Sequence, residues 1–197
     1  MIDDLDRTVE ELLRRELSRA FLRQVEISFA APDSEFPPTG VTLPAVDLSL
    51  YDIRENMELR SAGWIVEHSD DGTAMKKRKP VRVDCSYLIT AWATETKDRP
   101  IQEHLLLSEV MKVLLRYPVI PEALLQGALR GQDPPLPSST LQPGRLQSVS
   151  EFWQALGGKP KAALNYTVTI GLVPDKPVET EVPVRDKRLD FFQKEQA

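Results

Sequence analysis

The chain has 197 residues and a mass of 22.2 kDa, and 41% of its residues are hydrophobic. This length fits one domain with enough apolar material for a core, so a wholly disordered protein is excluded. The formal net charge of −5 argues against a protein that coats nucleic acid or an anionic membrane. The single cysteine, Cys85, cannot form an intramolecular disulfide, and together with two histidines it cannot build a usual structural zinc site. A reducing compartment is therefore expected.

The beginning of the chain, Met1 to Asp6, is acidic where a secretory signal would carry positive charge before an apolar stretch. No window approaches the roughly 20 consecutive apolar residues that a membrane-spanning helix needs. The sequence therefore predicts a soluble, cytoplasmic product whose partners include neither nucleic acid nor a membrane.

The first elements along the chain are a helix and two strands. Leucine and valine at helical spacing predict an amphipathic helix over 4–22, with Asp3 or Asp4 as its N-cap and charged residues on its outer face. Alternating apolar residues then predict strands over 25–29 and 45–53.

A long loop is expected over 57–80, because these residues lack a sustained period and end in a basic run. The strand over 81–94 has the clearest alternation, with the odd-numbered apolar residues on one face and the even-numbered residues on the other. Its second half is expected to be buried on both faces.

The remaining predicted elements are, in chain order, a helix over 100–116, a loop over 134–144, a short strand over 146–149, a short helix over 151–156 and a strand over 162–173. The apolar stripe of the longer helix includes Ile101, Leu105 and Val110. This order of elements indicates the α/β (α+β) class: a single twisted, mainly antiparallel or mixed sheet with the two main helices on one face. The expected division is a domain over 1–174 and an extended tail over 175–197.

Side chains suited to catalysis are few. The sequence lacks a dinucleotide-binding glycine motif, a Walker loop, a zinc-protease motif and a serine-hydrolase elbow. His104 lies on a predicted helix, where a lone histidine is more often a surface residue than a base, and His68 lies near Asp70 and Asp71 at no calcium-binding spacing. Cys85 lies on the apolar face of its strand, which favours an inert buried thiol. We therefore expect no catalytic residue, no metal and no cofactor.

Two segments favour binding, and each has a plain structural alternative. The run Lys76–Lys79 suits an acidic partner or a phosphate backbone, but without interleaved aromatic residues it also fits a solvated loop end. In the tail, Val178, Thr180, Val182 and Val184 alternate with glutamate and proline. Such a segment can add itself to the sheet edge of a neighbour, and a disordered tail is the alternative.

Three phrases occur in a fixed order: Leu50–Asn56 at a strand end, Ser86–Trp92 inside a strand, and Glu151–Gly157 at the start of the short helix. Together with the N-terminal helix and the last strand, they resemble the tube-terminator (cap) proteins of extracellular contractile injection systems. These are phage-tail-like particles that include antifeeding prophages and Photorhabdus virulence cassettes. The resemblance covers residues 5–174.

The resemblance implies a structural protein rather than an enzyme. It implies a ring, a homohexamer, that ends polymerisation of the inner tube and links the tube to the sheath, so the implied partners are the chain itself, the inner-tube protein and the sheath protein. The implied fold is that of phage tail terminators. Larger members of the family continue beyond the shared region, whereas this sequence ends at Ala197. A sheath or target-membrane function that depends on such an extension is therefore not expected here.

Polar residues at a strand end and alternating tail residues are the expected subunit or partner contacts: Arg54, Glu55, Asn56, Val178, Thr180, Val182 and Val184. Turn capping is the alternative for Asn56. By contrast, Tyr87, Trp92 and Trp153 are expected in the core.

Two other functions stay open. An assembly adaptor or chaperone would bind tube protein and be absent from the finished particle. An enzyme would use His104 or His68. The expected localisation is the cytoplasm during assembly, and then an injection particle that is either released or retained in the cell.

Overall fold

A computed structural model describes residues 1–31, 37–38, 40–61, 63–68, 74–94, 97–132, 135–142, 153–154, 161–173 and 178–181. The chain divides into two compact units. The first unit comprises Met1–Arg60 and Arg82–Leu172, and the second comprises Ser61–Val81 and Val173–Ala197.

The first unit is built on a five-stranded sheet with the strand order β1-β2-β5-β7-β6. Its strands are β1 (Glu26–Ser28), β2 (Ala45–Glu55), β5 (Val81–Trp92), β6 (Ser138–Thr140) and β7 (Ala163–Leu172). Strand β1 runs parallel to β2, whereas β2 with β5 and β6 with β7 are antiparallel pairs, so the sheet is mixed as the sequence predicts. The short β6 lies in the expected loop over 134–144, and its three polar residues carry no apolar alternation that would have marked it.

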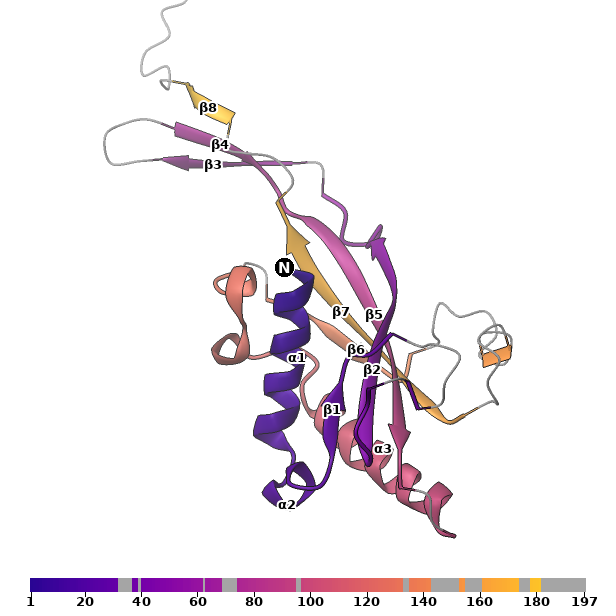
Figure 1. Ribbon diagram of the computed structural model, residues 1–197. Coiled ribbons are helices and arrows are strands. Elements are labelled where there is room, and N and C mark those ends of the chain that lie inside the picture. Colours follow the sequence, from indigo (N-terminus) through magenta and orange to yellow (C-terminus); the bar gives the residue numbers. More distant parts are fainter. Residues whose placement is uncertain are drawn as a thin grey trace, which may run out of the picture. The chain divides into compact units, whose positions relative to one another are not determined.

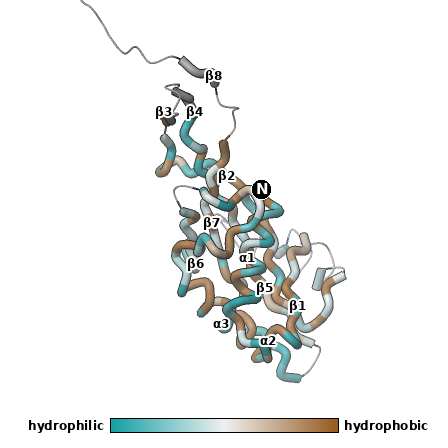
Figure 2. The backbone as a smooth tube through the Cα atoms, turned by 90° about the vertical axis from the view of Figure 1, so that its left-hand side faces the viewer, coloured by the Kyte–Doolittle hydropathy of each residue, from teal (hydrophilic) through white to brown (hydrophobic). Residues whose placement is uncertain are grey.

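Two helices, α1 (Ile2–Glu16) and α3 (Arg99–Arg116), cover one face of this sheet (Figure 1). One hydrophobic cluster joins α1 and α3 to the odd-numbered residues of β5, which confirms both the predicted layer and the predicted faces of that strand. Residues Cys85–Trp92 are all buried, as expected for its second half. Hydrophobic residues recur along α1 and the central strands between hydrophilic ones (Figure 2).

The single helix expected over 4–22 is interrupted. Helix α1 ends at Glu16, and Leu17 has extended backbone angles of φ −75° and ψ 149°. Ser18 then caps the short α2 (Arg19–Leu22), because its Oγ accepts a hydrogen bond of 3.2 Å from the Phe21 N–H. Serine is a strong N-cap residue, which explains why the helix restarts here although the apolar spacing continues.

The N-cap expected at Asp3 or Asp4 is also wrong, because α1 begins at Ile2 with Met1 as its N-cap. Asp4 lies in the first turn and is largely buried. Its Oδ2 accepts a hydrogen bond of 3.2 Å from the Ala128 N–H. The acidic side chain therefore joins the helix to a distant segment instead of starting the helix.

Two short 3₁₀ helices, η1 (Glu122–Leu124) and η2 (Gly127–Leu129), follow α3 and pack against α1. The Gln126 N–H donates a hydrogen bond of 3.0 Å to the Thr8 Oγ1. Gly127 has a φ of +51°, and a Cβ at this position would overlap the Asp4 carboxylate. Glycine is therefore required here both for its backbone conformation and for its lack of a side chain.

The apolar stripe predicted for α3 is only partly buried. Val110 and Leu114 belong to the core, but Ile101 and Leu105 are each 62% exposed. The two exposed residues lie one helical turn apart, on a side of α3 that the sheet does not cover.

The second unit contains a three-stranded sheet in the order β3-β4-β8, formed by β3 (Trp64–His68), β4 (Ala74–Arg78) and β8 (Val178–Glu181). Strands β3 and β4 form an antiparallel pair in which Trp64 lies opposite Arg78, so the loop expected over 57–80 is wrong. Strand β4 reads Ala-Met-Lys-Lys-Arg, and its basic residues give no apolar period that would predict a strand.

Strand β8 lies in the expected tail and pairs with β4, with Val178 opposite Lys76. The tail residues Val182 and Val184 lie outside the described part of the chain, as does the strand expected over 146–149. Of the helix expected over 151–156, the structure describes only Trp153 and Gln154, and both are helical.

Candidate functional site

The predicted contact residues Arg54, Glu55 and Asn56 lie at the end of β2, on the first unit. In the antiparallel ladder between β2 and β5, Arg54 lies opposite Asp84, and Glu55 lies opposite Val83. A β-bulge between Leu50 and Asp52 shifts this register. Because the bulge adds one residue to β2, both Tyr51 and Asp52 face away from the helices, and so does Arg54.

A polar groove of about 150 Å³ lies on this helix-free face of the sheet. Its lining comes from four strands and the segment after β6: Asp52, Arg54, Asp84, Ser86, Ser139, Gln142, Asn165 and Thr167. We call this the polar groove. The side chains are carboxylates, hydroxyls, amides and one guanidinium, so the groove suits a polar or charged group rather than an apolar one.

Asp84 is held in position by two neighbouring segments. The Asn56 Nδ2 donates to both Asp84 oxygens, at 2.9 Å and 3.1 Å, and the Thr169 Oγ1 donates to Oδ1 at 2.7 Å. These three hydrogen bonds hold the carboxylate in one orientation. The groove therefore contains a fixed carboxylate.

Asn56 also closes the turn after β2. Its Oδ1 accepts a hydrogen bond of 2.9 Å from the Leu59 N–H, and its own N–H donates to the Arg82 carbonyl at 2.8 Å. The turn-capping role that the sequence left open for Asn56 is therefore what the structure shows.

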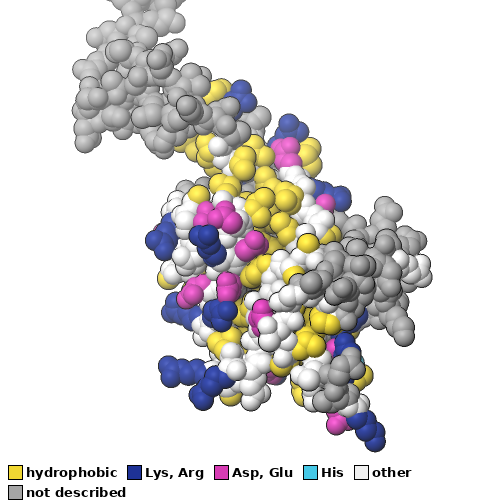
Figure 3. All heavy atoms as spheres, viewed as in Figure 1, with side chains coloured by type: hydrophobic (Ala, Val, Ile, Leu, Met, Phe, Trp, Pro, Cys, Tyr) yellow, Lys and Arg dark blue, Asp and Glu magenta, His cyan; other side chains and the backbone are white. Residues whose placement is uncertain are grey.

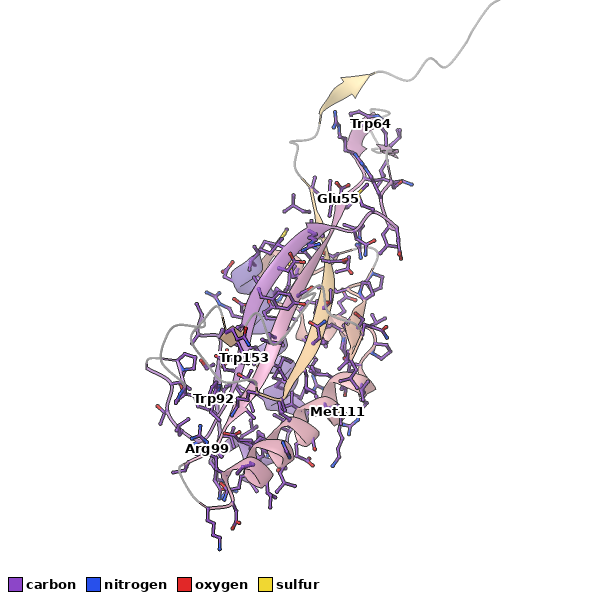
Figure 4. The ribbon with its side chains drawn as sticks, turned by 90° about the vertical axis from the view of Figure 1, so that its right-hand side faces the viewer. Glu55, Trp64, Trp92, Arg99, Met111 and Trp153 are labelled. Atoms are coloured by element: carbon purple, nitrogen blue, oxygen red, sulfur yellow. The ribbon has the colours of Figure 1, made fainter. Side chains whose placement is uncertain are left out.

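Arg54 and Glu55 have more freedom than Asn56. The Arg54 side chain is 53% exposed, and its Nε lies 2.7 Å from Asp52 Oδ2. The Glu55 carboxylate, 37% exposed, lies 3.2 Å from the Arg60 Nε at the same end of the sheet. In Figure 4, Glu55 lies at the end of β2. These two side chains are accessible to a partner, whereas the Asn56 amide is occupied within the chain.

At its other end, the helix-free face is apolar and covered. Trp153 is 2% exposed and forms a cluster with Leu88 and Trp92, which confirms that these tryptophans belong to the core (Figure 4). The Tyr51 hydroxyl donates a hydrogen bond of 2.8 Å to the Asn165 Oδ1 at the border between this cluster and the polar groove.

An ion-pair network lies next to the tryptophan cluster. Glu103 of α3 forms an ion pair with Lys161 and, at 2.9 Å, another with Arg99. Burial raises the pKa of Glu103, but the Lys161 and Arg99 cations outweigh this effect and hold its pKa below the ordinary value. The Lys161 Nζ also lies 4.1 Å from the centre of the Trp92 ring, so a cation–π contact strengthens the network.

On the face of the sheet that α1 and α3 cover, the buried thiol and phenol side chains do not form a catalytic arrangement. Cys85 is fully buried, and burial raises the pKa of its thiol to about 11, so the thiolate is disfavoured at neutral pH. Tyr87 is also fully buried, as expected, and its hydroxyl donates a hydrogen bond of 2.7 Å to Asp6. His104 is exposed on α3.

The described residues contain no group of three or more His, Cys, Asp or Glu side chains placed to hold a metal ion. Within the same part of the chain, no helix combines the length and the apolar character needed to cross a bilayer.

The structure therefore places Arg54 in the lining of the groove, connects Asn56 to the lining residue Asp84 and leaves Glu55 at the end of β2. Val178 and Thr180 lie in β8 of the second unit. Sequence reasoning missed most of the groove. The signal was present in the polar alternate positions of β5 and β7, such as Ser86 and Thr167, but one sequence does not show that these strands are neighbours.

Comparison with known proteins decides the family. The family model described as the Pvc16 N-terminal domain matches residues 4–186, which is most of the chain. The chain belongs to this family. Comparison with curated proteins finds no match.

Two solved structures resemble this member of the Pvc16 N-terminal domain family. The first is the sheath/tube terminator of an extracellular contractile injection system, PVC, in the extended state, with 25% identity and a TM-score of 0.72 over 98% of this chain. The second is the tube-terminating cap of the anti-feeding prophage, with 25% identity and a TM-score of 0.68 over 97% of this chain. This chain spans 64% and 61% of those two proteins. The sequence-based resemblance and the expected terminator-like fold are confirmed.

Proposed function

We propose that this chain is a tube terminator, or cap, of a contractile injection system: a structural protein that ends the inner tube and links it to the sheath. The observation that supports this most directly is the likeness of nearly the whole chain to a sheath/tube terminator and to a tube-terminating cap. Family membership over residues 4–186 points the same way.

The proposed mechanism is steric and adhesive, with no catalytic step. Six copies form a ring on the last layer of the inner tube. The lower face of the ring reproduces the contacts of a further tube layer, and its upper face offers no site for another one. Because only one face of the ring can bind a tube layer, the head-to-tail stacking of tube layers stops at the ring. The proposed mechanism does not use Cys85, which is buried, or His104, which is exposed on α3.

Arg54 and Glu55 are the proposed subunit contacts, because both are exposed at the end of β2. A contact through Asn56 would involve its backbone or the turn that it closes, since its amide group is occupied. For Val178, Thr180, Val182 and Val184, the proposal is that the segment lies against the sheath protein. Strand β8 is an edge strand of its sheet, and an edge strand can accept a further strand.

The proposed domain division places the folded domain in residues 1–174 and the partner-binding tail in residues 175–197. The first unit ends at Leu172, so a chain truncated before Pro174 retains every strand of the five-stranded sheet. We expect this truncated chain to keep its thermal transition and to lose sheath retention. Global unfolding on truncation would contradict the division.

The function is tested by deleting the chain's gene from a cluster that encodes a complete particle, and by imaging the particles. We expect tubes or sheaths of abnormal length and their rescue by the wild-type chain. Particles of normal length and normal sheath attachment would contradict the proposal.

Mass spectrometry of purified wild-type particles separates the cap from an assembly adaptor. A cap stays in the particle in a fixed ratio to the tube protein, whereas an adaptor or chaperone is absent from it. The proposed localisation follows the same scheme: assembly in the cytoplasm and then incorporation into the particle.

A further inference from the structure

The polar groove has an excess of negative charge that the proposed cap function does not use. Its lining contains the two carboxylates of Asp52 and Asp84 and the guanidinium of Arg54, while the largely buried Arg82 interacts with Asp84 from outside the lining. At about 150 Å³, its volume suits one long side chain rather than a metabolite. A groove of this size and charge is suited to a single basic side chain.

The groups in the groove are already oriented. Asp84 is fixed by Asn56 and Thr169, and Asp52 is engaged by the Arg54 Nε. Ser86 and Thr167 share a hydrogen bond of 2.9 Å across the floor, so their hydroxyl oxygens are also held. Because these acceptors need no rearrangement, an entering ammonium group would lose little free energy in ordering them.

The chain itself contains a basic segment of the right kind. Lys76–Lys79 has four consecutive basic residues at the end of β4, the densest positive run in the sequence. Lys79 is exposed and makes no ion pair with any residue in the described ranges. A lysine presents a compact positive charge at the end of a flexible stem, which matches a groove of one side chain.

We propose that the polar groove of one copy receives Lys79 of a second copy. The argument for this occupant is charge complementarity between two different surfaces of the same chain. Donor and acceptor surfaces differ, so the contact is head-to-tail and can be repeated from copy to copy until a ring closes. The inference rests on the proposed cap function, and it names the side chain and the site that join neighbouring subunits.

Cysteine cross-linking in the full chain tests this contact directly, because the one native cysteine, Cys85, is fully buried. Gln142, an exposed residue of the groove lining, and Lys79 are both changed to cysteine. In a mild oxidant, Gln142→Cys/Lys79→Cys is expected to give a ladder of disulfide-linked oligomers on a non-reducing gel. The two single variants are expected to give no species beyond a dimer.

The matched control replaces Gln142 by Lys112, which is 63% exposed on α3. Lys112→Cys/Lys79→Cys is expected to give no ladder. In addition, Lys79→Glu should weaken self-association at least about tenfold, because it sets a carboxylate against Asp84, whereas Lys112→Glu should change it less than about twofold.

Native mass spectrometry with and without the tube protein distinguishes the possible failures. If the wild-type chain forms a ring but the Gln142/Lys79 pair gives no more cross-linking than the control, the lysine contact is wrong and the cap function stands. If the chain stays monomeric with tube protein present, both the contact and the proposed ring are wrong.

Discussion

The Asn56 amide bridges both oxygens of the Asp84 carboxylate, at 2.9 Å and 3.1 Å, although the two residues lie 28 positions apart in the sequence. Asn56 also accepts the Leu59 N–H, so one side chain fixes both the carboxylate in the polar groove and the turn after β2. The geometry of the groove and the end of the strand are therefore coupled.

We expect Asn56→Ala to lower the free energy of unfolding by about 1–3 kcal/mol, because Asp84 loses its amide partner and the Leu59 N–H loses its acceptor. Chemical denaturation followed by circular dichroism measures this loss. Glu55→Ala, at the neighbouring exposed position, is the control and should change stability by less than about 0.5 kcal/mol. Equal effects of the two variants would contradict the bridging role.

Gly127 and Gly131 provide a matched pair, since both have a positive φ, +51° and +69°. A Cβ at Gly127 would overlap Asp4, whereas a Cβ at Gly131 has nothing within 4 Å. Gly131→Ala should therefore cost only the backbone strain of about 1–2 kcal/mol. We expect Gly127→Ala to lower the melting temperature clearly further, because the Asp4 carboxylate must also move. Identical melting temperatures for the two variants would show that the α1 contact tolerates the methyl group.

Trp153 packs against the face of the sheet that the helices leave uncovered. It is 2% exposed and packs against Leu88 and Trp92, so Trp153→Ala should lower the free energy of unfolding by about 3–5 kcal/mol. Leu105→Ala, at a position that is 62% exposed, should change it by less than about 1 kcal/mol. A Trp153→Ala variant as stable as Leu105→Ala would mean that the cluster contributes little in solution.

The ion pairs of Glu103 give a pH dependence with a defined sign. Folding lowers the pKa of Glu103 from its ordinary value of 4.5, so its contribution to stability is complete above that value and is lost as the pH falls through the folded-state pKa. At pH 7 we expect Glu103→Gln to be about 2–4 kcal/mol less stable than the wild type. Denaturation curves between pH 7 and pH 3 should show this difference shrinking toward acid. A difference that is constant with pH would contradict the ion-pair explanation.

Much of the fold is predictable because its elements carry local patterns. The alternation in β5 predicts both of its faces, and the apolar spacing in α1 predicts its buried side. Where a pattern is interrupted by local hydrogen bonding, as at Ser18, the boundary is missed. Where the strand residues are basic, as in β4, the strand itself is missed.

The candidate site was predictable only at its edge. Arg54 and Asn56 stand out in the sequence as polar residues at a strand end. Asp84 and Thr169 join them through hydrogen bonds between segments 28 and 85 residues apart, and such contacts depend on the strand order, which local periodicity does not encode.

The bulge in β2 makes the strand one residue longer than the partner it follows. If β2 kept every residue but alternated regularly after Tyr51, Ile53 would enter the groove, and Asp52 and Arg54 would face the helices. Loss of the single residue Tyr51 would instead leave Asp52, Ile53 and Arg54 opposite the same residues of β5, in a ladder without the bulge. The bulge, and not the alternation of the sequence, therefore decides which of these side chains reach the proposed contact between subunits.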